Sequence, residues 1–219
     1  MRHPARRAAT AWAAATVLVL TAAAGAAAPQ KESPPDVPPP AERSPAAREQ
    51  ARSYFTDVRL VDQHGRSHRL YSDLMDRRVV VIDSMFTTCA AVCPVLGQKM
   101  KKIQEAAGER LGEDVVLLSI TVDPEHDTPA EMAAYAKRFE ARDGWYFLSG
   151  EPQSVRLALS KLGYEVEDKD AHSTIVLMGN ERTGLWKKAN GLSSAGELVE
   201  IFESVLQDGG PAPGQGAGR

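Results

Sequence analysis

Apolar residues along the chain form short runs that alternate with segments of helical spacing. The runs 78–86 (RVVVIDSMF) and 114–122 (DVVLLSITV) are almost continuously apolar and rich in β-branched residues. Such runs are typical of strands that are buried on both faces of a sheet. Each run is followed by a segment with helical spacing of apolar residues, at 94–110 and 128–142. This alternation predicts an α/β domain.

The segments on either side continue this order. The remaining predicted elements are a short strand, a helix, a two-stranded hairpin and a closing helix, at 145–148, 152–162, 173–178 with 183–188, and 193–207. Ahead of the first buried run, residues 54–70 indicate two short strands around a turn at His64-Gly65. We therefore expect an α/β protein with a thioredoxin-like fold. A central mixed sheet is flanked by helices and carries an N-terminal β-hairpin extension.

The amino end has the composition of an export signal. A basic start (Arg2, Arg6, Arg7) precedes an uncharged, alanine-rich run at 8–28 that ends in small residues. We interpret residues 1–28 as a signal peptide or a membrane anchor. Both interpretations predict a periplasmic or other extracytoplasmic protein. It is either soluble after cleavage or tethered to the membrane through residues 8–28.

Composition divides the rest of the chain into three parts. Residues 29–50 are rich in proline and scattered charge, and residues 208–219 in glycine and proline. Neither stretch has enough apolar residues for a core, so we expect a disordered linker and a disordered tail. The thioredoxin-like domain is predicted at 51–207. With 26 basic and 29 acidic residues the net charge is −3, so we expect no nucleic-acid partner.

The only two cysteines, Cys89 and Cys93, lie four positions apart between a buried strand and a helix. A structural disulfide gains most by closing a long loop, and this loop is very short. We predict that the helix opens at Pro94 with Cys93 as its cap. The positive end of a helix favours thiolates, the form that attacks disulfides and binds metals. The pair is therefore a candidate redox pair and a candidate metal site.

Thiolates are soft ligands that favour Cu(I), and a third ligand would complete a trigonal site. His172 directly precedes the strand at 173–178, whose entry faces the cysteine loop in thioredoxin-like folds. It is the candidate third ligand. His126 follows the second buried strand and is expected to be an exposed loop residue, while His64 and His68 flank a turn and are expected in solvent.

These residues resemble the Sco/SenC family of copper proteins. FTTCAAVCP (86–94) is similar to the family's FTxCxxxCP loop, and SITVDPEHDTPAEMAAYAKRF (119–139) to its SVDPxxDTPxxLxxYxxxF segment. His172 followed by Ser173 and Thr174 matches a third piece. The resemblance covers roughly 54–202.

The resemblance implies a thioredoxin-like domain that binds Cu(I) or Cu(II) through Cys89, Cys93 and His172. It also implies a part in building the copper centre of cytochrome c oxidase, with the oxidase subunit that carries this centre, or another envelope copper protein, as partner. The family often has Asp directly before the ligand histidine. Here Ala171 stands in that place, which removes a carboxylate that would orient the ring.

Two activities remain open for the cysteine pair. The first is a copper chaperone, which transfers its metal without catalytic turnover. The alternative is a thiol–disulfide reductase, for which His172 is dispensable. A thiol peroxidase ranks behind both, because Ile82 and Phe86 replace the Pro and Thr of the peroxiredoxin loop PxxxTxxC. Zinc fits less well, since two sulfurs and one nitrogen leave tetrahedral zinc a ligand short.

Overall fold

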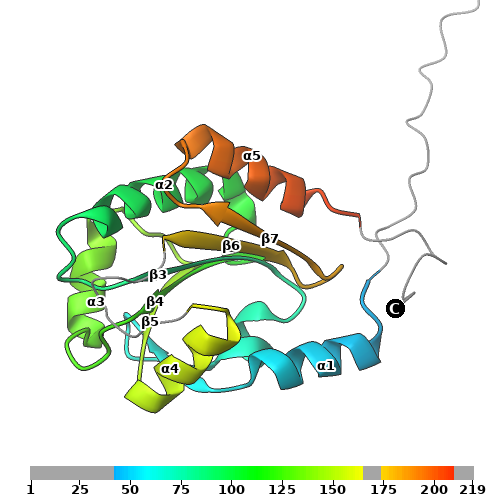
Figure 1. Ribbon diagram of the computed structural model, residues 1–219, viewed down its shortest axis with the longest axis horizontal. Helices are drawn as coiled ribbons and strands as arrows, with labels where there is room; N and C mark the ends of the chain where they lie inside the picture. The colour runs from blue at the N-terminus through cyan, green and yellow to red at the C-terminus, as the bar shows by residue number, and fades with distance from the viewer. Residues whose placement is uncertain (1–41, 165–173, 210–219) are drawn as a thin grey trace, which may run out of the picture. The chain divides into compact units, whose positions relative to one another are not determined.

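The computed structural model describes residues 42–164 and 174–209. Seven strands form one sheet, and helices cover both of its faces (Figure 1). The strands are β1 Arg59–Asp62, β2 Ser67–Arg69, β3 Val79–Met85, β4 Val115–Thr121, β5 Trp145–Ser149, β6 Ile175–Asn180 and β7 Leu185–Asn190. The helices are α1 Pro45–Phe55, α2 Val92–Ala107, α3 Pro129–Lys137, α4 Pro152–Lys161 and α5 Ala195–Leu206, with a π-helical turn at Leu70–Met75 and a 3₁₀ turn at Gly108–Arg110.

The sheet is mixed, with the strand order β2-β1-β5-β4-β3-β6-β7. Strands β3, β4 and β5 are parallel, whereas β6 and β7 on one side and β1 and β2 on the other pair antiparallel. Every residue of β3 and β4 is buried, as the continuous apolar runs predicted. The α/β, thioredoxin-like architecture expected from the sequence is confirmed.

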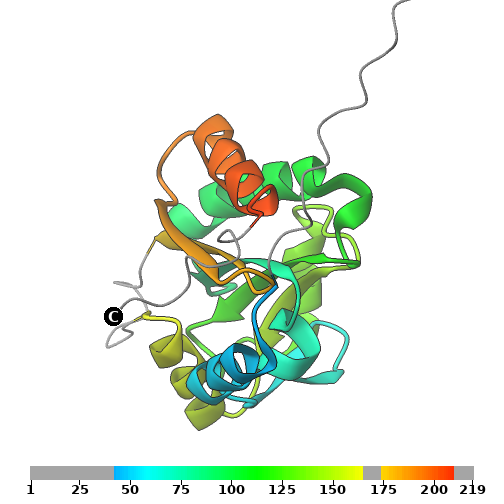
Figure 2. The same ribbon diagram turned by 90° about the vertical axis from the view of Figure 1, so that its right-hand side faces the viewer.

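Helices α2, α3 and α5 pack on one face of the sheet, and α1 and α4 pack on the other (Figure 2). Side chains of β3 alternate between the two cores. Val79 and Val81 contact the α2 side, and Val80 and Ile82 the α1 side. In the part of the chain that is described, no helix is both long and apolar enough to cross a bilayer.

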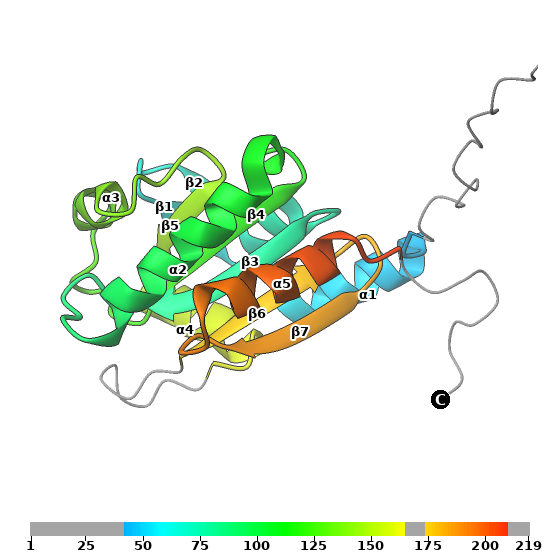
Figure 3. The ribbon, with the colours of Figure 1, turned by 90° about the horizontal axis from the view of Figure 1, so that it is seen from above.

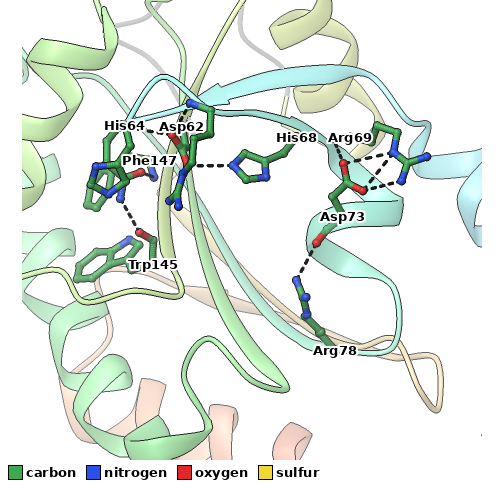
Figure 4. A network of polar contacts seen from close by, with 10 residues as sticks. Asp62, His64, His68, Arg69, Asp73, Arg78, Trp145 and Phe147 are labelled. Carbon is green, nitrogen blue, oxygen red and sulfur yellow. Dashed lines mark hydrogen bonds and ion pairs between the residues drawn. The ribbon is translucent and has the colours of Figure 1, made fainter.

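Strands β1 and β2 pair antiparallel at one edge of the sheet, and β1 also pairs with β5. The side chain of Gln63 extends this connection beyond β1. Its amide nitrogen donates to the Trp145 carbonyl (2.9 Å), and its amide oxygen accepts from the Phe147 N–H (2.9 Å) (Figure 4). Strands β1 and β2 are therefore an integral edge of the sheet, and a helix, α1, precedes them.

Asp62 organises the turn between β1 and β2 (Figure 4). Its carboxylate accepts from the N–H groups of His64 (2.8 Å) and Arg66 (2.9 Å), and one of its oxygens lies 2.9 Å from His68 Nε2. Burial alone would raise the pKa of Asp62, but these hydrogen bonds outweigh it and lower the pKa to about 2. His64 is exposed as expected, whereas His68 is largely covered and paired, so its assignment to solvent was wrong.

Helix α1 begins at Pro45, inside the range 29–50 that was predicted to be linker. Ser44 caps it, since its hydroxyl accepts a hydrogen bond from the Ala47 N–H (3.2 Å). Ala51 is buried in the core that α1 and α4 form with the sheet. Ser followed by Pro is an ordinary helix start. Proline-rich composition obscured that signal, and the predicted boundary at residue 51 therefore lies too late.

A buried ion pair anchors the segment ahead of α1. Glu181, which follows β6, is fully buried and accepts from Arg43 Nη1 (2.6 Å), from the Tyr71 hydroxyl (2.9 Å) and from Trp186 Nε1 (2.8 Å). The Arg43 N–H also donates to the Arg182 carbonyl (2.6 Å). The folded unit therefore includes Arg43.

Candidate metal centre

The cysteine loop, residues 86–91, connects the end of β3 to the start of α2 at the carboxyl edge of the parallel strands. Helix α2 then runs back along the sheet beside α5 (Figure 3). Open α/β sheets place their sites at this edge. Ala90 and Ala91 are exposed, whereas Cys89 and Cys93 behind them are only 8% and 3% exposed.

Helix α2 begins at Val92, two residues before the predicted start at Pro94. Proline is tolerated throughout the first turn, because N–H groups there have no partner within the helix. Cys93 consequently lies inside the first turn instead of capping it. The cap position, Ala91, offers no side-chain hydrogen bond, and the Cys93 N–H donates to Cys89 Sγ instead (3.4 Å). The Cys89 sulfur thus takes part of the role of a helix cap.

This arrangement makes the two thiols unequal. Burial raises the pKa of Cys89, but hydrogen bonds from the Cys93 thiol and from the N–H groups of Cys93, Ala91 and Val92 outweigh burial and lower it. Burial raises the pKa of Cys93 far above its usual range, and its role as donor to Cys89 raises it further. Of the two thiols, Cys89 therefore loses its proton more readily, and Cys93 retains its proton more strongly.

A buried carboxylate holds the cysteine loop in place. Asp127, on the loop after β4, is fully buried and accepts from the Thr87 N–H (3.2 Å to each oxygen) and from the Thr87 hydroxyl (2.5 Å). It also accepts from the Thr121 hydroxyl. Thr87 lies two residues before Cys89, so this contact fixes where the loop leaves β3.

A second polar group lies within the apolar core on the α2 side of the sheet. Asp83 of β3 accepts a hydrogen bond from the Ser119 hydroxyl (2.6 Å), which in turn accepts from Trp145 Nε1 (3.0 Å). Burial raises the pKa of Asp83 to about 7, against smaller opposing effects of the Ser119 hydrogen bond and its own N–H. Burial raises the pKa of Cys93 and of Tyr135 on α3, and the charge of Asp83 raises both further. The buried Tyr135 hydroxyl has no hydrogen-bond partner in the described part of the chain.

The structure places Cys89 and Cys93 together, whereas His172 lies outside the described residues. Among residues 42–164 and 174–209, no three His, Cys, Asp or Glu side chains are grouped to hold a metal ion. His126 is exposed on its loop, as expected. Two adjacent sulfurs, one of them favoured as thiolate, form a donor set suited to a soft ion such as Cu(I). His172 stays a prediction.

Asp83, Tyr135 and the Thr87–Asp127 contact were not foreseen from the sequence. One signal was available, because Asp83 interrupts an otherwise apolar run, and a charge in a buried strand needs a reason. Thr87 and Asp127 are 40 residues apart, and only the parallel pairing of β3 with β4 brings their loops together.

Comparison with known proteins gives a consistent picture. The family model described as SCO1/SenC matches residues 46–207. The SCO1 protein homolog of Bacillus subtilis is 33% identical over 95 residues, which cover 42% of this chain and 47% of that protein. A SCO2-like protein of Rickettsia conorii is 31% identical over 100 residues, 46% of each chain. The chain thus matches about half the length of these curated relatives.

Solved structures show the same fold. Bradyrhizobium japonicum ScoI with copper bound aligns with a TM-score of 0.55 at 24% identity, over 68% of this chain and 97% of that one. Yeast Sco1 with copper bound aligns with a TM-score of 0.57 at 20% identity, over 73% and 95%. Since the family model spans most of the chain, from within α1 to the residue after α5, the protein belongs to the SCO1/SenC family.

Proposed function

We propose that this protein is a copper chaperone of the cell envelope that helps to assemble the copper centre of cytochrome c oxidase. Cys89 and Cys93 bind the metal, and His172 is the third ligand. The observation that carries the proposal is the pairing of a favoured thiolate, Cys89, with a second sulfur at the same helix start. The oxidase subunit that carries the copper centre, or another envelope copper protein, is the proposed partner.

The site has the features that metal transfer needs. Hydrogen bonds from the helix amides lower the pKa of Cys89, so this thiol gives up its proton to a metal more readily than an ordinary cysteine does. Cys93 must release its proton on binding, and its burial makes that release costly. One sulfur loses its proton readily on metal binding and the other loses it at a cost. Such a site can bind copper and also release it to a partner with better ligands.

Known relatives support this assignment. Two of the structures with the same fold are named as Sco proteins with copper bound. A further solved structure with the same fold, BsSco, is described as a member of the Sco family of cytochrome c oxidase assembly proteins, with a disulfide switch. We carry copper binding and oxidase assembly over to this chain as proposals.

The asymmetry of the two thiols also favours a second candidate, a thiol–disulfide reductase. The Cys89 thiolate would attack a partner's disulfide and release one partner thiolate. The Cys93 sulfur, once its proton is lost, would then attack the Cys89 sulfur and release the second partner thiol. Two electrons pass from the dithiol to the partner, and a Cys89–Cys93 disulfide remains.

A copper titration tests the first proposal. The chain from residue 29 onward keeps Arg43 and helix α1, and it is titrated with Cu(I) under reducing conditions and, separately, with Cu(II). We expect one copper per chain and, for Cu(II), a thiolate-to-copper charge-transfer band. His172→Ala should weaken binding strongly, whereas His126→Ala, a change at an exposed loop histidine, should not.

The same variants separate the two functions. If the protein reduces a model disulfide, His172→Ala should leave that rate largely intact, since a reductase needs only the two sulfurs. Failure of the reduced protein to bind copper would contradict the chaperone proposal and leave the reductase. An equal loss of copper binding and reduction in His172→Ala would contradict the separation of roles.

We also propose that residues 1–28 export the domain and either are cleaved or tether it to the membrane. Fractionation of cells that produce the full chain tests this, with the mass of the mature amino end as readout. Recovery of the uncleaved chain in the cytoplasm would contradict it.

A further inference from the structure

The Tyr135 hydroxyl is buried without a hydrogen-bond partner. Tyr135 lies on α3, is 2% exposed, and packs edge-on against Phe139 and Phe147, with ring centroids 5.1 Å and 6.0 Å away. These rings leave the hydroxyl little freedom to reach solvent. An unsatisfied hydroxyl in such a place destabilises the fold relative to a satisfied one. A phenylalanine would fill the same space without that cost.

The Tyr135 hydroxyl lies on the same side of the sheet as the two cysteines. In the described part of the chain, four buried side-chain N or O atoms have no partner, and the other three belong to Arg48, Thr56 and Asp76, around helix α1 and the π-helical turn. Tyr135 belongs to the hydrophobic core that contains Cys89 and Cys93. Burial raises the pKa of Tyr135 most, the nearby groups Cys93, Asp83 and Cys89 raise it further in that order, and Arg138 has a smaller opposing effect.

The state of Cys93 decides what this hydroxyl can do. With its proton in place, the Cys93 thiol donates to Cys89, and a neutral sulfur is a poor acceptor. When a metal displaces the proton, the sulfur becomes a buried anion that needs donors, and hydrogen bonds to an anion are about twice as strong as neutral ones. The hydroxyl of Tyr135 is an uncommitted donor in the same core.

We propose that the Tyr135 hydroxyl donates a hydrogen bond to the Cys93 sulfur in the copper-loaded protein, and so serves as a positioning residue of the metal site. The proposal rests on the copper-binding function proposed above. In the metal-free protein the hydroxyl stays unpaired, and its cost lowers the stability of that state. Loading relieves the cost, so Tyr135 makes copper binding more favourable without being a ligand.

Tyr135→Phe removes a single oxygen and tests this. Without copper, we expect the variant to be more stable to urea than the unaltered protein, because the unpaired hydroxyl is gone. With copper, we expect about 10-fold weaker Cu(I) binding, a smaller gain in melting temperature on loading, and a shifted charge-transfer band for Cu(II), since hydrogen bonds to a ligand sulfur tune that transition.

Tyr164→Phe is the matched control. The Tyr164 hydroxyl is also buried, but it donates to the carbonyls of Ile82 (2.9 Å) and Ile175 (3.0 Å) and lies in the core on the other face of the sheet. Its removal should destabilise the metal-free protein and leave copper affinity and spectrum unchanged. The two variants therefore move stability in opposite directions, and only Tyr135→Phe changes the copper site.

Asp83→Asn decides which group the hydroxyl serves. If Tyr135 acts on Cys93, Tyr135→Phe should weaken copper binding by the same factor with Asp83 or Asn at position 83. An effect of Tyr135→Phe that disappears in the Asp83→Asn background would assign the hydroxyl to Asp83 and overturn the proposal. Unchanged copper affinity in Tyr135→Phe would overturn it while the function stands. Absence of copper binding by the unaltered protein would overturn the function, and this proposal with it.

Discussion

The carboxylate of Asp127 accepts hydrogen bonds from both the N–H and the hydroxyl of Thr87, and thereby joins the loops that follow β3 and β4. The first of these loops carries the cysteines. A buried carboxylate is satisfied by several donors at once here, so the loss of any one donor leaves part of its charge without compensation. The geometry of the cysteine loop thus depends on a residue 38 positions after Cys89.

Thr87→Val should therefore disturb the cysteine loop more than the small change in side-chain size suggests. Valine has the shape of threonine but lacks the hydroxyl that binds Asp127, and we expect a loss of about 1–3 kcal/mol in the free energy of unfolding. Urea unfolding measures it. Thr87→Ser keeps the hydroxyl and is the matched control, with a smaller loss. Equal losses in the two variants would show that the methyl group, and not the hydrogen bond, matters.

Asp83 should make the stability of the protein depend on pH. Its folded pKa of about 7 lies above the ordinary aspartate pKa of 3.8, so the folded state binds the proton more tightly than the unfolded state does. This contribution is fully present below pH 3.8 and is lost as pH rises through about 7. Asp83→Asn removes the dependence.

Urea unfolding of both proteins between pH 5 and pH 8.5 checks this prediction. We expect the stability of Asp83→Asn relative to the unaltered protein to increase with pH, by about 3 kcal/mol between pH 5 and pH 8.5. The difference in the free energy of unfolding between the two proteins at each pH removes, to first order, the contribution of all other titrating groups. A difference that is constant across this range would contradict the prediction.

The two cysteines should differ in reactivity. Because hydrogen bonds lower the pKa of Cys89 while burial raises that of Cys93, alkylation by iodoacetamide at pH 7 should label Cys89 first. Peptide mass spectrometry after partial reaction gives the order directly. Cys89→Ser should leave a chain that is labelled slowly, and Cys93→Ser one that is labelled faster than Cys89→Ser. Equal labelling of both sulfurs would contradict the assigned asymmetry.

Arg43 should contribute strongly to stability although it precedes the first helix. Its removal in Arg43→Ala leaves the fully buried Glu181 without its guanidinium partner, and we expect a loss of about 3 kcal/mol. Lys102→Ala breaks an exposed pair with Glu105 and should cost less than about 1 kcal/mol. Thermal unfolding of the two variants compares them. Similar small losses in both would show that the Arg43 pair is dispensable.

Much of the fold could be predicted because the signals are local. Residues 78–86 and 114–122 were predicted as buried strands, and β3 and β4 occupy Val79–Met85 and Val115–Thr121. The segment 128–142 was predicted as a helix, and α3 occupies Pro129–Lys137, where the Thr128 hydroxyl caps it by accepting from the Glu131 N–H (3.3 Å). A continuous apolar run and a capping sequence act within a few residues, so they can be recognised without the rest of the chain.

The parts that escaped prediction depend on residues far apart or on competing local signals. Helix α1 was assigned to the linker because nearby prolines outweighed the start signal at Ser44-Pro45. At the site, the spacing of Cys89 and Cys93 was sufficient to identify the pair as a candidate. Their inequality depends on which sulfur faces the helix amides, and the unpaired Tyr135 hydroxyl depends on how α3 packs. Neither of these two features can be predicted from the spacing of residues in the sequence.

The Arg43–Glu181 ion pair also fixes the place of the segment ahead of α1 relative to the sheet. Strand β3 runs from Val79, which pairs with Asn180 beside Glu181, to the cysteine loop, a distance of about 20 Å. The amino ends of α1 and α2 accordingly lie at opposite ends of the long axis (Figures 1 and 3). The segment at Arg43 therefore lies at the opposite end of β3 from the two sulfurs, and substitutions that disturb one of these ends can leave the other intact.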